Sequence, residues 1–250
     1  SLFPDDGIDV KELMKCADVA MYRAKGSGRN NHQFYKPEMN ARTHDRLLLE
    51  NSLRRALEED QLLLYYQPQV NMVSGELIGM EALVRWQPPG ERMVSPGEFI
   101  PLAEETGLIL PIGEWVLRSA CLQIRSWQEK GLNPARLSVN ISALQFNQHD
   151  FLDVVDRILA ETKIDPQWLE LELTESAAMD NIESTIRTLD KLKRRGFHLS
   201  IDDFGTGYSS LSYLKRLPIT KLKIDRSFIR DVTVDADNAA ITASIIALGK

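Results

Sequence analysis

The sequence has few cysteines and no long hydrophobic run, and each shortage excludes a class of protein. Its two cysteines, Cys16 and Cys121, lie far apart and show no C-x-x-C spacing, so neither a disulfide framework nor a zinc site is indicated. Such thiols are expected in a reducing cytoplasm. No apolar run reaches about 18 residues, the length that crosses a membrane, and the first residues lack a signal-peptide pattern. We therefore expect no membrane insertion of this segment.

Basic residues are also outnumbered, because the chain has 30 lysines and arginines against 36 aspartates and glutamates, which gives a net charge of −6. Proteins that coat nucleic acid or lie on a membrane surface need a basic face, so no nucleic acid polymer is expected as a partner. A compact anionic ligand remains possible where cations gather locally. With 250 residues, 43% of them hydrophobic, the chain is long enough for one large domain plus a fragment, or for two small domains.

The first part of the chain reads as a piece of another domain. A helical apolar stripe covers residues 10–24, and residues 32–35 are strand-like. One helix and one strand cannot make a core, so residues 1–40 are expected to belong to another domain. Residues 41–60 predict a charged amphipathic linker helix that joins this part to the rest.

From residue 61 onward, predicted strands and helices alternate, which is typical of a parallel α/β sheet. The short turn around Gly75 joins the first two strands and predicts an antiparallel hairpin. The predicted strands are 62–70, 77–86, 137–141, 169–174, 198–202 and 221–225. The predicted helices are 96–105, 111–130, 146–162, 181–195, 208–216 and 238–250.

Polar residues recur on one face of these strands. In residues 169–174 the leucines share one face, while Glu170 and Glu172 share the other. Lys221 and Lys223 are likewise in phase. Six strands fit either an open sheet or a barrel, but an open sheet covered by helices on both faces has apolar residues on both. The pattern therefore favours a TIM-like (β/α)8 barrel with an antiparallel first strand, in which polar groups sit near the carboxyl ends of the strands.

The stretch 197–211 is a buried strand that ends in two acids and a glycine-rich turn. Asp202 and Asp203 would point to opposite faces if the strand continued, but Gly205 and Gly207 indicate that it stops. Both carboxylates can then aim at one spot. The alternative interpretation is a solvated turn whose hydroxyl side chains cap a helix.

Oxygen donors gather from four predicted strands. None is a histidine, so the set suits Mg²⁺ or Mn²⁺ better than zinc. The cations Arg85 and Lys223 supply charge for an anionic substrate, which fits phosphoryl chemistry. The donors are Glu81, Asn140, Glu172 and Asp202, with Asp203 beside the last.

These motifs resemble those of the EAL-domain phosphodiesterases, which hydrolyse cyclic di-GMP. Glu81-Ala82-Leu83 is similar to the motif that names the family, and the resemblance covers about residues 45–250. The first 40 residues resemble the end of a GGDEF (diguanylate cyclase) domain, without the signature loop that carries cyclase activity. Further EAL-like motifs are Tyr66-Gln67-Pro68, Ser138-Val139-Asn140, Glu172-Leu173-Thr174-Glu175, Asp202-Asp203-Phe204-Gly205 and Lys221-Leu222-Lys223-Ile224-Asp225.

The resemblance implies two metal ions, Mg²⁺ or Mn²⁺. Asp202 would bridge them and Asp203 would help to hold the second. A water between the ions would attack one phosphodiester bond and open the ring to linear pGpG. The first ion would be bound by Glu81, Asn140, Glu172 and Asp202.

The resemblance also implies roles for the side chains around the ions. Lys223 would orient the water or stabilise charge in the transition state, which makes it catalytic together with Glu81 and Asp202. Glu175 would brace the loop 204–210. Substrate contacts would come from Gln67, Leu83, Arg85 and Asp225.

In this family the barrel continues into strands that bear a further glutamate and glutamine, so we expect residues 61–250 to be an incomplete EAL domain of a longer GGDEF–EAL protein. A homodimer is expected through the EAL domain, in the cytoplasm or in the cytoplasmic part of a membrane-anchored sensor. Two alternatives stay open. One is a receptor that holds cyclic di-GMP without cutting it, and the other is a module that regulates the neighbouring cyclase-like domain through the linker helix.

Overall fold

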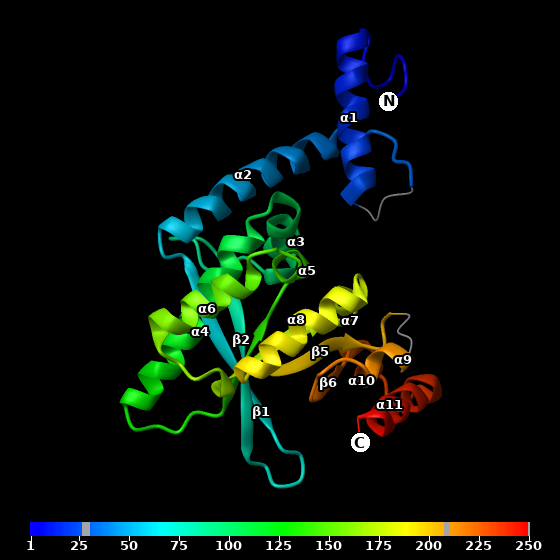
Figure 1. Cartoon of the computed structure of the whole chain (residues 1–250). Helices are drawn as coiled ribbons and strands as arrows, with labels where there is room; N and C mark the ends of the chain where they lie inside the picture. The colour runs from blue at the N-terminus through cyan, green and yellow to red at the C-terminus, as the bar shows by residue number, and fades with distance from the viewer. Residues whose placement is uncertain (27–30, 208–210, 250) are drawn as a thin grey trace. The chain divides into compact units, whose positions relative to one another are not determined.

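The computed structural model describes residues 1–26, 31–207 and 211–249. Its contacts divide the chain into two units, Ser1–Glu59 and Asp60–Lys250. The first unit consists of helices α1 (Val10–Gly26) and α2 (Glu38–Glu58), which pack against each other (Figure 1). Its α1 helix buries Cys16, Ala20 and Ala24, which are spaced four residues apart and so form one stripe.

Two predictions for this unit need correction. Residues 32–35 form no strand and take an irregular backbone instead. The linker helix begins three residues earlier than the predicted 41, at Glu38 directly after Pro37, and ends at Glu58. Proline is favoured at a helix start because its ring fixes φ and its missing N–H is not needed there. The assignment of residues 1–40 to a GGDEF domain stays a prediction.

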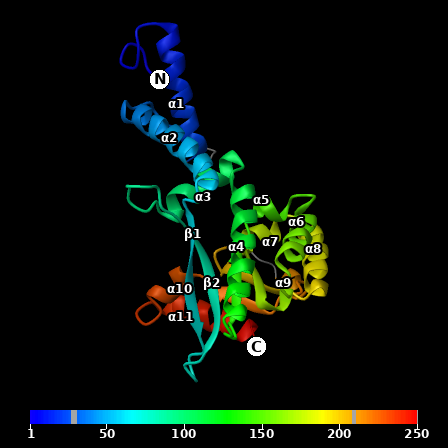
Figure 2. The same ribbon diagram turned by 90° about the vertical axis from the view of Figure 1, so that its left-hand side faces the viewer.

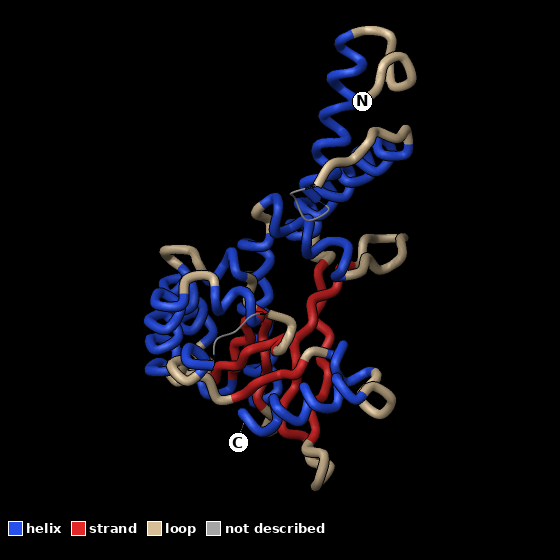
Figure 3. The backbone as a smooth tube through the Cα atoms, turned by 90° about the vertical axis from the view of Figure 1, so that its right-hand side faces the viewer, coloured by secondary structure: helices blue, strands red, loops and turns tan. Residues whose placement is uncertain are grey.

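A six-stranded sheet forms the centre of the second unit, with its strands in sequence order (Figure 3). The first pair is antiparallel and the other four pairs are parallel, which confirms the predicted hairpin and the parallel sheet that follows it. The strands are β1 (Leu62–Val70), β2 (Leu77–Trp86), β3 (Arg136–Asn140), β4 (Leu169–Thr174), β5 (His198–Phe204) and β6 (Lys221–Ile224).

The sheet curls strongly enough to bring its two edges together. In a flat sheet of this size the edge strands would be about 24 Å apart, since neighbouring strands lie about 4.8 Å apart. Yet Lys221 Nζ on β6 donates a hydrogen bond to Gln69 Oε1 on β1, at 2.9 Å. This curl is that of the predicted TIM-like barrel and not that of an open sheet.

The two faces of the sheet differ as the sequence pattern predicts. Leu169, Leu171 and Leu173 are fully buried on the outer face of β4, where helices cover the sheet. Helix α4 packs beside β1 and β3, and α6 packs on α4 (Figure 2). The helices of this unit are α3 (Pro96–Thr106), α4 (Ile109–Glu129), α5 (Ala143–Phe146), α6 (Phe151–Thr162), α7 (Glu175–Met179), α8 (Ile182–Arg195), α9 (Leu211–Leu214), α10 (Arg226–Arg230) and α11 (Ala236–Leu248), with a 3₁₀ turn at Pro166–Trp168. In the described ranges, no helix combines the length and apolar character needed to span a bilayer.

The predicted helix 146–162 is wrong as a single element, because the structure has α5 and α6 in its place. Ser142 and Gln145 form a capping box that starts α5 earlier, with Ser142 Oγ accepting a hydrogen bond from Gln145 N at 3.2 Å. The helix then stops at Phe146 and a new one starts at Phe151. Of the predicted helix 208–216, α9 covers Leu211–Leu214, and residues 208–210 lie outside the described residues.

Core packing of α4 on the sheet generates a stability prediction. Leu117 is 3% exposed and Leu122 on the same helix is 51% exposed. We expect Leu117→Ala to lower the free energy of unfolding by about 2–5 kcal/mol, because it leaves a cavity. Leu122→Ala is the matched control and is expected to change it by less than about 1 kcal/mol. Urea denaturation followed by circular dichroism measures both, and equal losses would contradict the packing described here.

Candidate functional site

Three carboxylates from three strands meet on the inner face of the sheet. Glu81 on β2, Glu172 on β4 and Asp202 on β5 each offer an oxygen, and these oxygens lie within 4.8 Å of one another. Asn140 on β3 joins them, since its Nδ2 donates a hydrogen bond to Glu81 Oε1 at 2.8 Å. Glu81 and Asp202 are 121 positions apart in the sequence. The parallel register of the strands brings them together, as the phase of the strands predicts. We call Glu81, Glu172 and Asp202 the acidic trio.

Lys223 on β6 lies among the acidic trio. Its Nζ donates hydrogen bonds to Glu172 Oε2 at 2.5 Å, to Asp202 Oδ2 at 2.7 Å and to Glu81 Oε2 at 3.2 Å. Burial lowers the pKa of Lys223, but the charge of Glu172 and the hydrogen bonds that Lys223 donates to Asp202 and Glu172 outweigh burial and raise it overall. The side chain is therefore an ammonium ion that offsets the repulsion among the carboxylates.

The Glu172 side chain is fully buried and provides the test of whether a metal ion fits here. Burial raises its pKa to about 7, despite the attraction of Lys223. Its Oε1 atom is buried and has no hydrogen-bond partner among the described residues. Buried polar atoms ordinarily have a partner, and a carboxylate oxygen facing two more carboxylates suits a hard divalent cation. The acidic trio and Asn140 therefore fit a metal ion.

Asp203 does not join the acidic trio, because β5 has a bulge there. The strand continues through both aspartates to Phe204, so the expected end at Asp202 is wrong. Asp203 has the left-handed backbone angle φ 53°, and the pairing of β5 with β6 shifts register between Ile201 and Phe204. Partial burial, together with the charges of Asp202 and Asp225, raises the pKa of Asp203. Its carboxyl group interacts with that of Asp225, which contributes to this rise.

The predicted substrate-contacting residues lie along β1 and β2 and at the end of β6. Gln67 is exposed and lies opposite Glu81 in the hairpin register. Leu83 and Arg85 follow Glu81 toward the carboxyl end of β2, on the same face. The Arg85 guanidinium lies 5.5 Å from the centre of the Tyr65 ring, and its Nη1 donates to the Val84 carbonyl oxygen at 2.8 Å.

Asp225 has a structural contact of its own, because it caps α10. Its Oδ1 accepts a hydrogen bond from Ser227 N at 2.8 Å. Thr174 caps α7 in the same way, with Oγ1 accepting from Ala177 N at 3.3 Å. Neither short helix was predicted, although an aspartate or a threonine at the end of a strand is the usual signal for a helix start.

Glu175, the first residue of α7, reaches the loop after β5. It is 2% exposed, and its Oε2 accepts hydrogen bonds from Gly205 N at 2.8 Å and Gly207 N at 3.2 Å. A Cβ atom at Gly207 would lie 2.9 Å from Glu175 Oε1, so the loop approaches the carboxylate closely because the residue is glycine. The remainder of the predicted loop, residues 208–210, lies outside the described residues.

The comparisons with known proteins agree with this geometry. The chain matches the EAL domain family over residues 50–250. It is 49% identical to the bifunctional diguanylate cyclase/cyclic di-GMP phosphodiesterase MucR of Pseudomonas aeruginosa over 250 residues, which is all of this chain and 36% of MucR. It is 44% identical to the cyclic di-GMP phosphodiesterase NbdA of the same species over 250 residues, which is all of this chain and 32% of NbdA. The chain thus spans about a third of the length of these curated relatives.

A solved structure of the PaMucR phosphodiesterase in complex with c-di-GMP has the same fold. It superposes with a TM-score of 0.78 and 50% sequence identity, and the match covers 81% of this chain and 82% of that one.

Metal binding is expected to weaken as the pH falls. Because the pKa of Glu172 is raised to about 7, its carboxyl group is protonated below that pH and ionised above it, and metal ligands must be deprotonated. We expect the Kd for Mn²⁺, measured by calorimetry, to rise up to about tenfold per pH unit below 7 and to level off above roughly pH 8. In Glu172→Gln both the binding and its pH dependence should be lost. A Kd that stays constant from acid to alkaline pH would contradict the role of this carboxyl group.

The contact between Glu175 and the loop predicts protection of two backbone amides. In Glu175→Ala we expect the N–H groups of Gly205 and Gly207 to exchange with deuterium at least about tenfold faster, since each loses a charge-assisted hydrogen bond. Glu183→Ala is the control, because Glu183 pairs only with Arg216 at the exposed surface in the described structure. Nuclear magnetic resonance resolves the two amides, and unchanged exchange at both would show that the carboxylate does not hold the loop.

Proposed function

This chain belongs to the EAL domain family, and we propose that it hydrolyses cyclic di-GMP to linear pGpG with divalent metal ions, in bacterial second-messenger signalling. The observation that carries the proposal is the acidic trio, whose oxygens lie within 4.8 Å of one another beside the ammonium group of Lys223. The relatives named as cyclic di-GMP phosphodiesterases support the choice of substrate.

We propose Mg²⁺ or Mn²⁺ as the ions, two in number. Bound there, they would supply a polarising charge and a water of lowered pKa. Glu81, Asn140, Glu172 and Asp202 would hold the first ion, and Asp203 would help Asp202 to hold the second. The oxygen-only donor set, with its unpartnered buried Glu172 Oε1, is what favours hard cations.

The side chains around the acidic trio have separate tasks in this proposal. Lys223 holds the carboxylates in place and puts positive charge where negative charge develops on the phosphoryl group. Arg85 binds a substrate phosphate, because a guanidinium offers several donors in one plane. Gln67, Leu83 and Asp225 contact the rest of the substrate. Glu175 keeps the loop after β5 beside the site through Gly205 and Gly207.

We propose further that the chain works as a homodimer and next to a GGDEF domain, of which residues 1–40 would be the end. A relative named as a bifunctional diguanylate cyclase and phosphodiesterase, which matches over the whole chain, supports that neighbour. Cys16 and Cys121 are buried free thiols, which fits reaction in a reducing cytoplasm.

Turnover is expected to depend on the acidic trio. We expect Glu81→Ala and Asp202→Ala each to lower kcat at least about 10³-fold, because each removes a metal ligand and its charge. Linear product is followed by chromatography after incubation of the protein with cyclic di-GMP and Mg²⁺, with and without chelator. Glu183→Gln is the control and should keep full activity, since this residue is exposed and pairs with Arg216 on the surface.

The outcomes separate an enzyme from a receptor. Product that forms only with metal, and is lost in both alanine variants, supports the proposal. Binding of cyclic di-GMP without any product would make the protein a receptor. Turnover in the two alanine variants equal to that of the unmutated protein would contradict the assignment of the site.

A further inference from the structure

A second polar layer lies next to the acidic trio on the inner face of the sheet. Glu170 on β4 and Lys221 on β6 come two residues before Glu172 and Lys223, so each pair shares a face. Lys221 Nζ donates to Glu170 Oε1 at 2.6 Å and to Gln69 Oε1 at 2.9 Å. Strand β5, which lies between β4 and β6, contributes the small and fully buried Ser200 there. The long side chains of the flanking strands therefore have room to meet.

Glu170 is a fixed and charged anchor. It is 1% exposed, and its Oε1 also accepts a hydrogen bond from Ser138 Oγ at 3.0 Å. Arg136 Nη1 lies 3.6 Å from Oε2. Burial raises the pKa of Glu170, but the hydrogen bond and charge of Lys221 outweigh burial and lower it overall. The group that Lys221 contacts is therefore a carboxylate held from three sides.

Strand β6 is a short edge strand whose pairing with β5 is interrupted by a register shift. It has four residues, all partly exposed, and lies at the sheet edge with β5 as its partner. The register passes from Ile201↔Leu222 directly to Phe204↔Ile224, so Lys223 lies opposite the bulge. Backbone hydrogen bonds from Thr220 N to Leu199 O at 3.0 Å and from Asp225 N to Phe204 O at 3.4 Å lie on either side of this position, while the register pairs Lys223 itself with no residue of β5.

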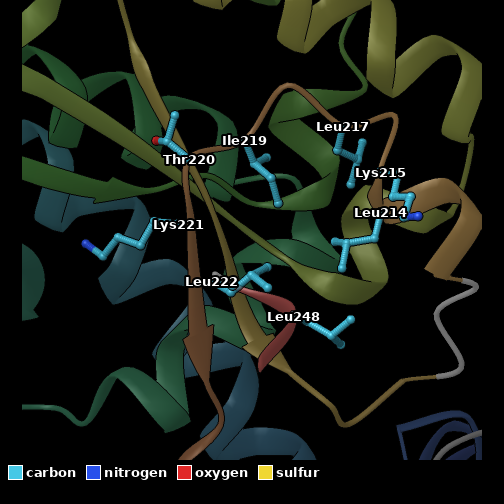
Figure 4. Close-up of a pocket in the computed structure, with 9 residues that line it drawn as sticks. Leu214, Lys215, Leu217, Ile219, Thr220, Lys221, Leu222 and Leu248 are labelled. Carbon is cyan, nitrogen blue, oxygen red and sulfur yellow. The ribbon is translucent and has the colours of Figure 1, made fainter. Parts of the chain in front are cut away.

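The outer face of β6 gives little support either. Leu222 borders an apolar cavity of about 810 Å³ that Leu214, Leu217 and Leu248 also line. Figure 4 shows these leucines around the cavity, while the amino group of Lys221 extends away from them. Among the described residues, the side-chain hydrogen bonds and ion pairs of β6 are made on the inner face, by Lys221 and Lys223.

We propose that Lys221 is a positioning residue for Lys223. By joining β6 to Glu170 on β4 and to Gln69 on β1, it holds the edge strand in the register that places Lys223 Nζ among the acidic trio. The expected effect on turnover rests on the proposed function, whereas the effect on the position of Lys223 does not.

The kinetic test compares two substitutions at one position. We expect Lys221→Met to lower kcat about 10- to 100-fold, because a misplacement of about 1 Å in a catalytic group costs that much. KM should stay within about threefold, since Lys221 is not proposed to contact substrate. Lys221→Arg should recover most of the loss, because its guanidinium can still pair with Glu170 and Gln69.

The matched control is Arg195→Met. Arg195 Nη2 lies 2.6 Å from Asp156 Oδ2, and its side chain is 29% exposed, against 32% for Lys221. Both substitutions remove a basic residue of similar exposure from an ion pair of the same length, but Asp156 is 47% exposed where Glu170 is 1% exposed, and the Arg195 pair joins α8 to α6. Arg195→Met is expected to keep kcat, and an equal kcat for the two methionine variants would overturn the proposal.

A crystal structure of metal-free Lys221→Met gives a readout that does not depend on activity. We expect Lys223 Nζ to lose at least one of its three carboxylate contacts, and retention of all three would overturn the proposal. If Lys221→Met does not fold, Gln69→Leu takes its place, with the same expected loss of contact and the same overturning result. If the unmutated protein has no turnover, the proposed function fails while the crystal structure still decides the role of Lys221.

Discussion

The site depends on one electrostatic constraint, which is that three carboxylates share a small and mostly buried space. Their oxygens lie within 4.8 Å of one another, a distance at which like charges away from bulk water repel strongly. A cation must be close, and Lys223 supplies one with contacts of 2.5, 2.7 and 3.2 Å. The raised pKa of Lys223 and that of Glu172 are two consequences of the same crowding.

This constraint explains why the inner face of the sheet carries two successive layers of acid–lysine pairs. Each buried acid on β4 is matched by a lysine two strands away on β6, Glu170 by Lys221 and Glu172 by Lys223. Unpaired buried charges would cost several kcal/mol each. The charge pairs therefore stabilise the curled sheet, and the curl brings the paired residues within reach of each other. Lys221 reaches Gln69 on the opposite edge strand only because the sheet is curled. On the outer face of β4, buried leucines pack in place of charge pairs.

Much of this arrangement could be predicted from the sequence, since strand phase and strand order follow from local patterns. Glu81, Asn140, Glu172 and Asp202 were placed together on that basis. The bulge at Asp203 could not be predicted, because its left-handed φ of 53° depends on how β5 meets β6 and not on the residues nearby. The break between α5 and α6 was not predicted, because the residues between Phe146 and Phe151 include no proline or glycine to indicate it. The contact of Lys221 with Gln69 joins residues 152 positions apart, beyond the reach of any periodic pattern.

The charges of the site also bear on which ions it suits. With Glu172 ionised, the acidic trio and Lys223 together carry two net negative charges, which one divalent ion neutralises and one monovalent ion does not. With Glu172 protonated, one of those charges is gone, so the raised pKa of that residue couples ion binding to pH. In the proposed function, a second ion would take its charge from outside the trio. Asp203, whose pKa is raised by partial burial and by the charges of Asp202 and Asp225, is the nearest carboxyl group in the chain sequence. An anionic substrate supplies further negative charge at the same place, so the second ion and the substrate are expected to favour each other's binding.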